Sequence, residues 1–458
     1  MNCQHTQPLN RMFSKAQSDL LTPLEFSTLS IEMLETSNVN NQFNKSIGAN
    51  RILAGYTYFF QFLAHDIVPN TTSSLNSRVV SPQLNLDSVY GTGADGFNSF
   101  LFELDGKFKH RNAFDFDVWR EPAPDMENDF RAFIPESRND ENIIVTQIHR
   151  LWQKLHNRLI TEIIEPNVKQ KIGIARRCTT AIFHKILIED SLRVILHNKV
   201  HAFYFEKYKH FYYQANSQLT NLPAEFTHAA FRFGHSMVLE RYRIKKGINV
   251  PLTKLLRSGR APLNSDMGID WNLFFGSKTK QVANLIDLKI VATLGAISPG
   301  INIVERNLAA GKNSKIASGE SIVAQIKDPA NKFNEFLTCF EREIANWCLQ
   351  TAIGNSGYQS IARVLEDTHK EARTPLWLCI LHENYAVLGD NAFKLGLLGS
   401  AIVGDVLRKS LCEVYKQSPT DSYQNCLQKM NGIFNSARDL LGVEIKTMLD
   451  LVNYLKTN

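Results

Sequence analysis

The chain has 458 residues, of which 44% are hydrophobic and 21% are charged, and its formal net charge is +6. This composition excludes an intrinsically disordered chain and is typical of a folded protein with a large core. The small positive charge does not indicate nucleic-acid binding, and we interpret the densest basic stretch, RYRIKK at residues 241–246, as a solvated surface.

The seven cysteines form no CxxC pair, and their spacing indicates neither a zinc site nor a disulfide framework. We therefore expect reduced, mostly buried thiols, as in a reducing compartment. The N-terminal residues lack the apolar core of a signal peptide, and no stretch approaches about 18 consecutive apolar residues. We expect a cytoplasmic protein without a transmembrane helix.

The hydrophobic pattern predicts a mainly α-helical fold with little β structure. Residues 1–48 are polar and poorly periodic, and we expect an N-terminal arm laid over a single domain of residues 49–458. Residues 68–140 are rich in turn-forming residues, and so long a connection is unusual unless it serves a site. Helical periodicity marks residues 51–67, 141–164, 173–196, 223–239, 319–327, 332–351, 357–366, 375–385, 392–414 and 443–455.

The stretch FFQFLAHDI, residues 59–67, places His65 and Asp66 side by side in an apolar helix. Gln61 lies four residues before His65 and shares its helix face, whereas Asp66 is rotated by about 100°. The histidine and the aspartate therefore face different surroundings. A histidine in an apolar helix is often a buried structural residue, and the pattern alone leaves this interpretation open.

A second histidine, His235, lies in the apolar stretch AAFRFGHSMV. A neutral imidazole in such surroundings is a good ligand for a buried metal or a haem iron, although a structural role is again open. His149 and His156 share one face of the helix predicted at residues 141–164, but no carboxylate pattern completes a metal site there. We interpret these two histidines as structural.

Two polar stretches contain further candidates. In ESRNDEN, residues 136–142, an acidic side chain before the long helix suits the helix dipole, or Arg138 and Glu141 project together into a cleft. In SPQLNLDSVYG, residues 81–91, hard oxygen donors recur at every second position. A loop with such spacing can wrap a calcium ion, although turn-rich loops often contain such residues. The donors are Ser81, the Gln83 carbonyl, Asn85 and Asp87.

Together and in this order, the motifs resemble the animal-type haem peroxidase superfamily, in particular its shorter bacterial members. The resemblance covers about residues 50–410 and implies one mainly α-helical domain with haem b between a distal and a proximal helix. The matching segments are GYTYFFQFLAHDI, LNLDSVYG, SRNDENIIVTQIHRLWQKLHNRL, FTHAAFRFGHSMV, VERNLAAGKNSKIASGESIV and TPLWLCILHENYAVLGDNAFKLGLLGSAIVGDVL.

On the distal side, the resemblance implies that His65 is the catalytic histidine and that Gln61 reaches into the distal cavity. His65 would take a proton from hydrogen peroxide and return it to the departing oxygen. Arg138 would stabilise the charge that develops as the O–O bond breaks. The oxidised haem would then take electrons from a small donor, such as a phenol or a halide.

On the proximal side, the resemblance implies that His235 is the ligand of the haem iron. Asn307 would orient its other ring nitrogen, which sets the tautomer and raises the basicity of the ligand. Arg232 would pair with a haem propionate. A calcium ion is also implied, and its ligands would be Asp66, Ser81, Gln83, Asn85 and Asp87.

The sequence departs from the larger family members, which attach haem through two ester bonds. Glu141 matches the ester-forming glutamate, but Ala64 stands at the aspartate position, so we expect at most one ester link. Asn142 excludes the sulfonium link that some relatives make through methionine. Ala310 stands where relatives carry a second arginine near the propionates, and Asn85 lowers the charge of the calcium loop.

The motifs favour a peroxidase over two alternatives. A fatty-acid dioxygenase-like enzyme of this superfamily would carry a radical-forming tyrosine three residues before the proximal histidine, where this chain has Arg232. A non-catalytic haem-binding protein that keeps the fold has no need of His65, Arg138 and His235 together. The sequence does not indicate the electron donor or the oligomeric state.

Overall fold

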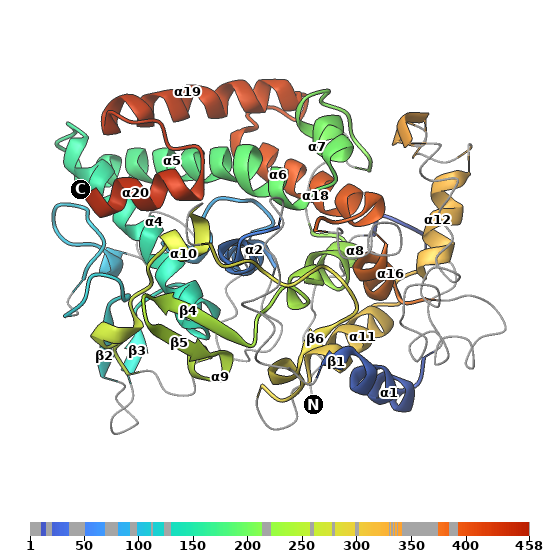
Figure 1. The fold of residues 1–458 in the computed structure, drawn as a ribbon. Coiled ribbons are helices and arrows are strands. Elements are labelled where there is room, and N and C mark those ends of the chain that lie inside the picture. Colours follow the sequence, from blue (N-terminus) through green and yellow to red (C-terminus); the bar gives the residue numbers. More distant parts are fainter. Residues whose placement is uncertain are drawn as a thin grey trace, which may run out of the picture.

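The protein is mainly helical, as its sequence predicts (Figure 1). Its computed structural model describes residues 11–14, 21–35, 51–68, 81–91, 99–110, 113–122, 130–212, 221–256, 261–276, 280–297, 302–328, 330, 333, 335–336, 338–340, 374–383 and 393–457. In these ranges, no helix is long and apolar enough to cross a membrane.

The core is built around three long helices, α2 (Ala54–Ile67), α4 (Ile143–Glu162) and α5 (Val168–Ile186). Helix α2 contacts α4, and α4 contacts α5. Asparagine side chains start the two longer helices: Asn142 accepts a hydrogen bond from the Ile144 N–H, and Asn167 accepts one from the Gln170 N–H. Twelve residues of α2 are buried, which places this helix inside the molecule.

Helix α5 continues through a π-helical turn, η3 (Leu187–Ser191), into α6 (Leu192–Ile195). Helix α19 (Tyr423–Leu441) lies along α5 and was missed by the sequence analysis (Figure 1). In the described ranges, the other helices of at least seven residues are α1 (Pro23–Met33), α7 (Asn198–Phe205), α11 (Ile303–Asn313), α12 (Gly319–Lys327), α16 (Leu376–His382), α18 (Leu397–Tyr415) and α20 (Met448–Thr457).

The short elements lie mainly in the connections. The α-helical turns are α3 (Asp87–Tyr90), α8 (Ala224–Thr227), α9 (Leu252–Leu255) and α10 (Asn272–Phe275). The 3-10 turns are η1 (Ser99–Leu101), η2 (Ser137–Asp140), η4 (Ala230–His235), η5 (Ser265–Met267) and η6 (Ala292–Gly295). Among the residues that the structure describes, the strands form three two-stranded sheets: β1 (Leu34–Glu35) parallel to β6 (Ile290–Val291), β2 (Arg120–Pro122) antiparallel to β3 (Phe130–Ala132), and β4 (Arg241–Lys245) antiparallel to β5 (Ile248–Pro251).

The helix predicted over residues 223–239 is wrong as a single element, because the structure has the short α8 followed by η4. Ala229 leaves the helical region with φ −138° and ψ −74°. The Arg232 side chain then donates to the Thr227 carbonyl, at 3.0 Å, and so satisfies an acceptor that a continuous helix would have used. The helices predicted at 332–351 and 357–366 lie largely or wholly outside the described residues.

The described parts of residues 1–48 pack on the rest of the protein. The backbone N–H groups of Met12 and Phe13 donate to the Glu225 carboxylate, at 3.1 and 3.3 Å. Helix α1 contacts α11, and β1 pairs with β6. These contacts tie the described N-terminal residues to the rest of the protein, while the division into an arm of residues 1–48 and a domain of residues 49–458 remains a prediction.

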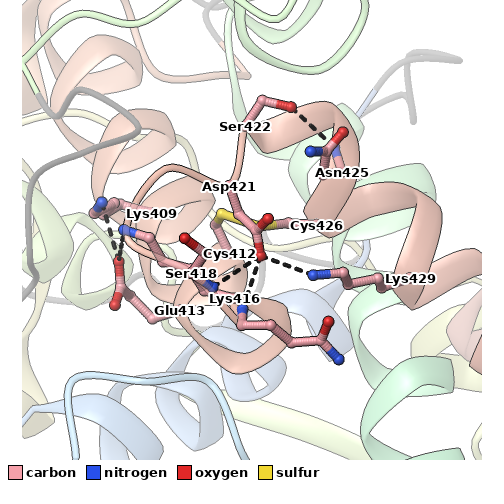
Figure 2. Close-up of a disulfide and its surroundings, with 11 residues drawn as sticks. Lys409, Cys412, Glu413, Lys416, Ser418, Asp421, Ser422, Asn425, Cys426 and Lys429 are labelled. Atoms are coloured by element: carbon pink, nitrogen blue, oxygen red, sulfur yellow. Dashed lines mark hydrogen bonds and ion pairs between the residues drawn. A yellow bond between two sulfur atoms is a disulfide. The ribbon is translucent and has the colours of Figure 1, made fainter.

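Helices α18 and α19 are joined by a disulfide between Cys412 and Cys426, whose Cα atoms lie 5.4 Å apart (Figure 2). The expectation of reduced thiols is therefore wrong for this pair, and it no longer supports a reducing compartment. The intervening turn brings the cysteines together, and the Asp421 carboxylate holds this turn through the Ser418 N–H and an ion pair with Lys429 (Figure 2). The remaining cysteines are buried free thiols at 178 and 379, an exposed free thiol at 339, and Cys3 and Cys348 outside the described residues.

Candidate active site

His65, the predicted distal histidine, is buried near the end of α2. Its Nδ1 lies 2.9 Å from Oδ1 of Asn139, so Nδ1 carries the hydrogen and donates it. Within the described part of the chain, Nε2 has no hydrogen-bond partner. Burial, followed by the positive charge of Arg138, lowers the pKa of His65 to about 4. The ring is therefore neutral near pH 7, with a free lone pair on Nε2.

Helix α2 opens to its surroundings only on the face that carries His65. Gln61 and Ala64 are its only partly exposed residues, and all the others are buried. They are three residues apart, and His65 follows Gln61 by one turn, so all three lie on neighbouring parts of one face. The structure thus confirms that Gln61 and His65 share a surface, and the small Ala64 keeps that surface open.

Arg138 lies in η2 and is tied to the end of the distal helix. Its Nη2 donates to the carbonyls of His65 and Val68, at 3.1 and 2.8 Å, and the guanidinium pairs with Glu136 at 2.9 Å. Arginine donors on the last carbonyls of a helix satisfy groups that have no helical partner. Its Nη1 has no partner among the described residues. Arg138 therefore fixes the distal helix and keeps one donor nitrogen uncommitted.

Asn139 is a site residue that the sequence analysis missed. It is fully buried, and its amide lies between two imidazoles: Oδ1 faces His65, and Nδ2 lies 3.1 Å from Nδ1 of His149. Nε2 of His149 lies 3.2 Å from the Gln153 amide. His149, which we interpreted as structural, therefore helps to orient Asn139 and acts on His65 only through it. The available signal was the position of Asn139 directly after Arg138.

A buried charge cluster holds η2 in place. Arg120 is bound to Asp117 at 2.9 Å and to Oδ2 of Asp140 at 2.7 Å, and all three side chains are buried. A buried guanidinium between two carboxylates is fully compensated, so this arrangement is rigid. Asp140 thus serves the scaffold, whereas the next residue, Glu141, is exposed and precedes the N-cap of α4.

His235, the predicted proximal histidine, ends η4 and is partly exposed. Its Nδ1 lies 2.9 Å from Nδ2 of Asn307, and Oδ1 of Asn307 accepts a hydrogen bond from Arg232 Nη1, also at 2.9 Å. Because a guanidinium can only donate, the Asn307 oxygen must face Arg232 and the NH₂ group must face His235. Nδ1 of His235 is therefore an acceptor here, and its ring hydrogen belongs on Nε2.

The two histidine segments are neighbours. Helix α2 contacts η4, and the Phe60 ring packs against Phe231 and Phe233 with centroids 6.3 and 5.6 Å apart. Next to His235, a Cβ atom on Gly234 would meet no atom within 4 Å, so the backbone borders open space. Nε2 of His235, like that of His65, has no hydrogen-bond partner among the described residues.

Two arginines place positive charge beside His235. Burial, followed by the charges of Arg232 and Arg306, lowers the pKa of His235 to about 3. Burial and the charge of Arg306 also lower the pKa of Arg232 to about 10. Neither arginine has a carboxylate partner in the described ranges. Arg306 was missed by the sequence analysis, which looked for a second arginine at Ala310, one helical turn later on α11.

The expected calcium residues come together behind α2. Asp66 is fully buried, and its two carboxylate oxygens accept the N–H groups of Leu86 and Ser88, at 3.2 and 2.9 Å. Other expected ligands also accept protein donors: Ser81 from the Gln83 N–H, Asn85 from the Asp87 N–H, and Asp87 from Arg176. The described residues contain no group of three or more histidine, cysteine or acidic side chains placed to hold a metal.

Comparison with known proteins agrees with the motifs. Residues 78–287 match the family model of the animal haem peroxidases, and no curated protein matches the chain significantly. Among solved structures, the chain is similar to peroxidase A from Dictyostelium discoideum, with a TM-score of 0.64 and 16% identity over 98% of this chain and 92% of that one.

Two plant enzymes are also similar in structure. The fatty acid alpha-dioxygenase of Oryza sativa has a TM-score of 0.59 and 12% identity over 98% of this chain and 81% of that one. The fatty acid alpha-dioxygenase of Arabidopsis thaliana has a TM-score of 0.59 and 12% identity over 97% of this chain and 76% of that one. At such identities these likenesses show the fold, and they confirm the predicted architecture.

Proposed function

The chain belongs to the animal haem peroxidase superfamily, and on that premise we propose that it is a peroxidase that uses hydrogen peroxide to oxidise a small donor, such as a phenol or a halide. One observation carries the proposal: His65 and His235 lie on neighbouring segments, each is fixed at Nδ1 by an asparagine, and each keeps Nε2 free of described protein partners. One imidazole suits iron ligation and the other suits proton transfer.

The residues around His235 fit haem. Open space at Gly234 leaves room beside the ring, and the half-buried Arg232 and the exposed Arg306 have no acidic partner in the described chain, so both could pair with the carboxylates of a ligand. Iron ligation at Nε2 requires the hydrogen of His235 to move to Nδ1. Asn307 must then turn its oxygen to the ring, and Arg232 must exchange that oxygen for a propionate.

The distal residues would perform the proton transfers. Bound haem would supply an iron that holds peroxide and accepts its oxidising equivalents. Nε2 of His65 accepts the peroxide proton while Asn139 holds the opposite N–H, and the same nitrogen returns the proton to the departing oxygen. Burial, followed by the charge of Arg138, keeps His65 neutral, and the same charge would oppose the negative charge that develops on oxygen. Gln61 adds a polar group one turn before His65.

The covalent attachment of haem is proposed to involve at most one bond. Ala64 cannot form an ester, and Glu141 is the remaining match to the family pattern. We expect acid–acetone extraction to remove haem completely from a Glu141→Gln variant. If wild-type haem extracts equally well, Glu141 is not esterified and the haem is held without a covalent link.

A fatty-acid dioxygenase is the runner-up because two structural neighbours have that activity and the superfamily contains both oxygenases and peroxidases. The residue three positions before the proximal histidine favours the peroxidase. It is Arg232, whose guanidinium bonds the Thr227 carbonyl and Asn307, rather than a radical-forming tyrosine. Incubation of the haem-loaded protein with fatty acid and oxygen, without peroxide, should therefore give no oxygen uptake.

The test of the proposal is the rate at which the haem-loaded protein reacts with hydrogen peroxide in a stopped-flow experiment. His65→Ala should slow this reaction by roughly 10²–10⁴-fold, the usual contribution of general acid–base catalysis. His210→Ala is the matched control, because this histidine is on the surface with a side chain 40% exposed. A His65→Ala protein that reacts as fast as wild type would rule out the catalytic assignment.

A further inference from the structure

The resemblance implies a calcium ion behind the distal helix, but the structure offers another cation at that place. We propose that Arg176 takes the role of the ion: its guanidinium, carried by α5, closes the loop of residues 81–91 against α2, and the distal site is built without calcium.

Arg176 binds the kinds of oxygen that a calcium ion would bind. Its Nη2 donates to the Asp87 carboxylate at 3.0 Å and to the Asn85 backbone carbonyl at 3.3 Å. Carboxylate and main-chain carbonyl oxygens are the usual calcium ligands, and here they come from alternate residues of one loop. The guanidinium also lies 5.0 Å from the centre of the Tyr90 ring, so the loop contributes a third contact.

Asp66 is held by backbone donors without a metal. Its two oxygens accept the N–H groups of Leu86 and Ser88, although burial outweighs these bonds and raises the pKa of Asp66 to about 7. Leu86 has a left-handed backbone, with φ +58°, which is strained for a leucine. Asp66, the residue after His65, therefore has a structural role, because it binds the strained turn at Leu86 to helix α2.

Side chains of the long helices fix the rest of the loop. The Tyr90 hydroxyl lies 3.1 Å from Nδ1 of His156, and Nε2 of His156 lies 3.0 Å from the Gly106 carbonyl. His184 bonds the Leu84 carbonyl through Nε2. His156 thus binds the Tyr90 hydroxyl and His184 binds the Leu84 carbonyl, two loop groups that would otherwise bind water or an ion. The loop is thus held at its start, middle and end by protein groups.

Charge also opposes a divalent ion. Asp66 and Asp87 are the two acidic side chains of the expected ligand set, and Arg176 already forms an ion pair with Asp87 at 3.0 Å. A calcium ion bound to Asp87 and the Asn85 carbonyl would lie next to the guanidinium and be repelled by it. The described acidic residues do not supply the third carboxylate that would offset this repulsion.

The first experiment measures calcium binding to the full-length wild-type protein. After dialysis against EGTA and then buffer, we expect no stoichiometric uptake of ⁴⁵Ca²⁺ at millimolar concentration. We also expect the same Tm in EGTA and in Ca²⁺. A wild-type protein that takes up one Ca²⁺ per chain, with a higher Tm in Ca²⁺ than in EGTA, would overturn the proposal.

The second experiment removes the guanidinium. Arg176→Met should lower the Tm in EGTA by about 2–4 °C, because the loop loses its internal cation. Arg177→Met is the matched control, since the neighbouring side chain is exposed, and its Tm should not change. Arg176→Lys keeps the charge but not the fork-shaped donor, and should lie between the two. If Arg176→Met fails to fold while Arg177→Met folds normally, the guanidinium is required and the proposal stands. Equal Tm values for wild type and Arg176→Met would overturn it.

Discussion

The predicted distal and proximal histidines, His65 and His235, are each contacted at Nδ1 by an asparagine side chain. Opposite ends of the two amides face the two rings. At His65 the asparagine presents its oxygen to Nδ1, and at His235 it presents its NH₂ group. At His235 the polarity comes from the far end of the amide, because the Asn307 oxygen is taken by Arg232, which can only donate. Asn139 instead meets Nδ1 of His149, a ring nitrogen that can donate or accept, so His149 does not by itself orient this amide.

Arg232 therefore sets the tautomer of His235 through Asn307, whereas the tautomer of His65 follows from the oxygen that Asn139 presents to Nδ1. At His65, Nε2 has a free lone pair and can accept a proton. At His235, Nε2 carries the ring hydrogen, so it can ligate iron only after Arg232 moves and Asn307 turns. We infer that the two propionates of haem, by attracting Arg232 and Arg306, would convert the proximal side to the polarity of the distal side.

Breaking the distal chain has the largest expected effect. In Asn139→Leu, Nδ1 of His65 loses its hydrogen-bond acceptor, so the ring hydrogen is no longer favoured on Nδ1 over Nε2. We expect the reaction with hydrogen peroxide to slow by about 100-fold, the lower end of the general-base contribution. Asn139→Asp keeps an acceptor and should stay within about tenfold of wild type. Equal rates for the leucine variant and wild type would mean that Asn139 does not set the tautomer.

Replacing Asn307, the partner of His235, has the next largest expected effect. Asn307→Leu removes the partner of His235 and should weaken haem binding by about 10–100-fold, as loss of such a partner does for other metal sites. Asn307→Asp offers His235 an acceptor without rotation, so it should bind haem at least as tightly and lower the Fe(III)/Fe(II) reduction potential. Haem titration and redox titration measure the two effects. A higher potential in the aspartate variant would contradict this account of Asn307.

The arginine pair gives a smaller effect. Arg306→Gln removes one charge-assisted hydrogen bond and should speed haem transfer to apomyoglobin by about tenfold. Ala310→Arg restores the arginine that relatives carry at that position and should slow the transfer. Arg241→Gln, a change on the strand β4, is the control with no expected effect. Transfer rates that do not respond to Arg306 would remove it from the haem site.

The smallest expected effect is one of pH. The pKa of His65 is lowered from 6.5 to about 4, so the neutral, proton-accepting ring persists as the pH falls. The rate constant for peroxide should therefore be constant from pH 8 to pH 5 and should fall only as the pH drops through about 4. Rate constants that follow a pKa near 6.5 would show that His65 is not desolvated as described.

The sequence predicted the long amphipathic helices α2, α4 and α12 because their apolar periodicity dominates locally. It missed the break between α8 and η4, because the Arg232 side chain, rather than any helix-breaking residue, ends the helical hydrogen bonding. The disulfide also depended on tertiary structure, since only the return of α19 brings Cys426 to Cys412.

Within the candidate site, the family motifs indicated the two histidines but not all of the polar side chains around them. Asn139 and Arg306 are ordinary polar residues in sequence, and their roles come from what lies at the other end of their side chains. The role of Arg176 also could not be predicted from sequence. A basic residue on an amphipathic helix is typical of a solvated surface, and only the position of the loop of residues 81–91 gives it partners. Contacts between distant segments therefore decide what the motifs leave open.

Haem ligation by His235 can be measured in the visible absorption spectrum of the full-length protein titrated with haem, before and after hydrogen peroxide. We expect one haem per chain in the wild type, with a Soret band that shifts when peroxide is added, and loss of this spectrum in His235→Ala but not in His210→Ala. A His235→Ala protein with the wild-type spectrum and the wild-type response to peroxide would show that His235 does not ligate the iron.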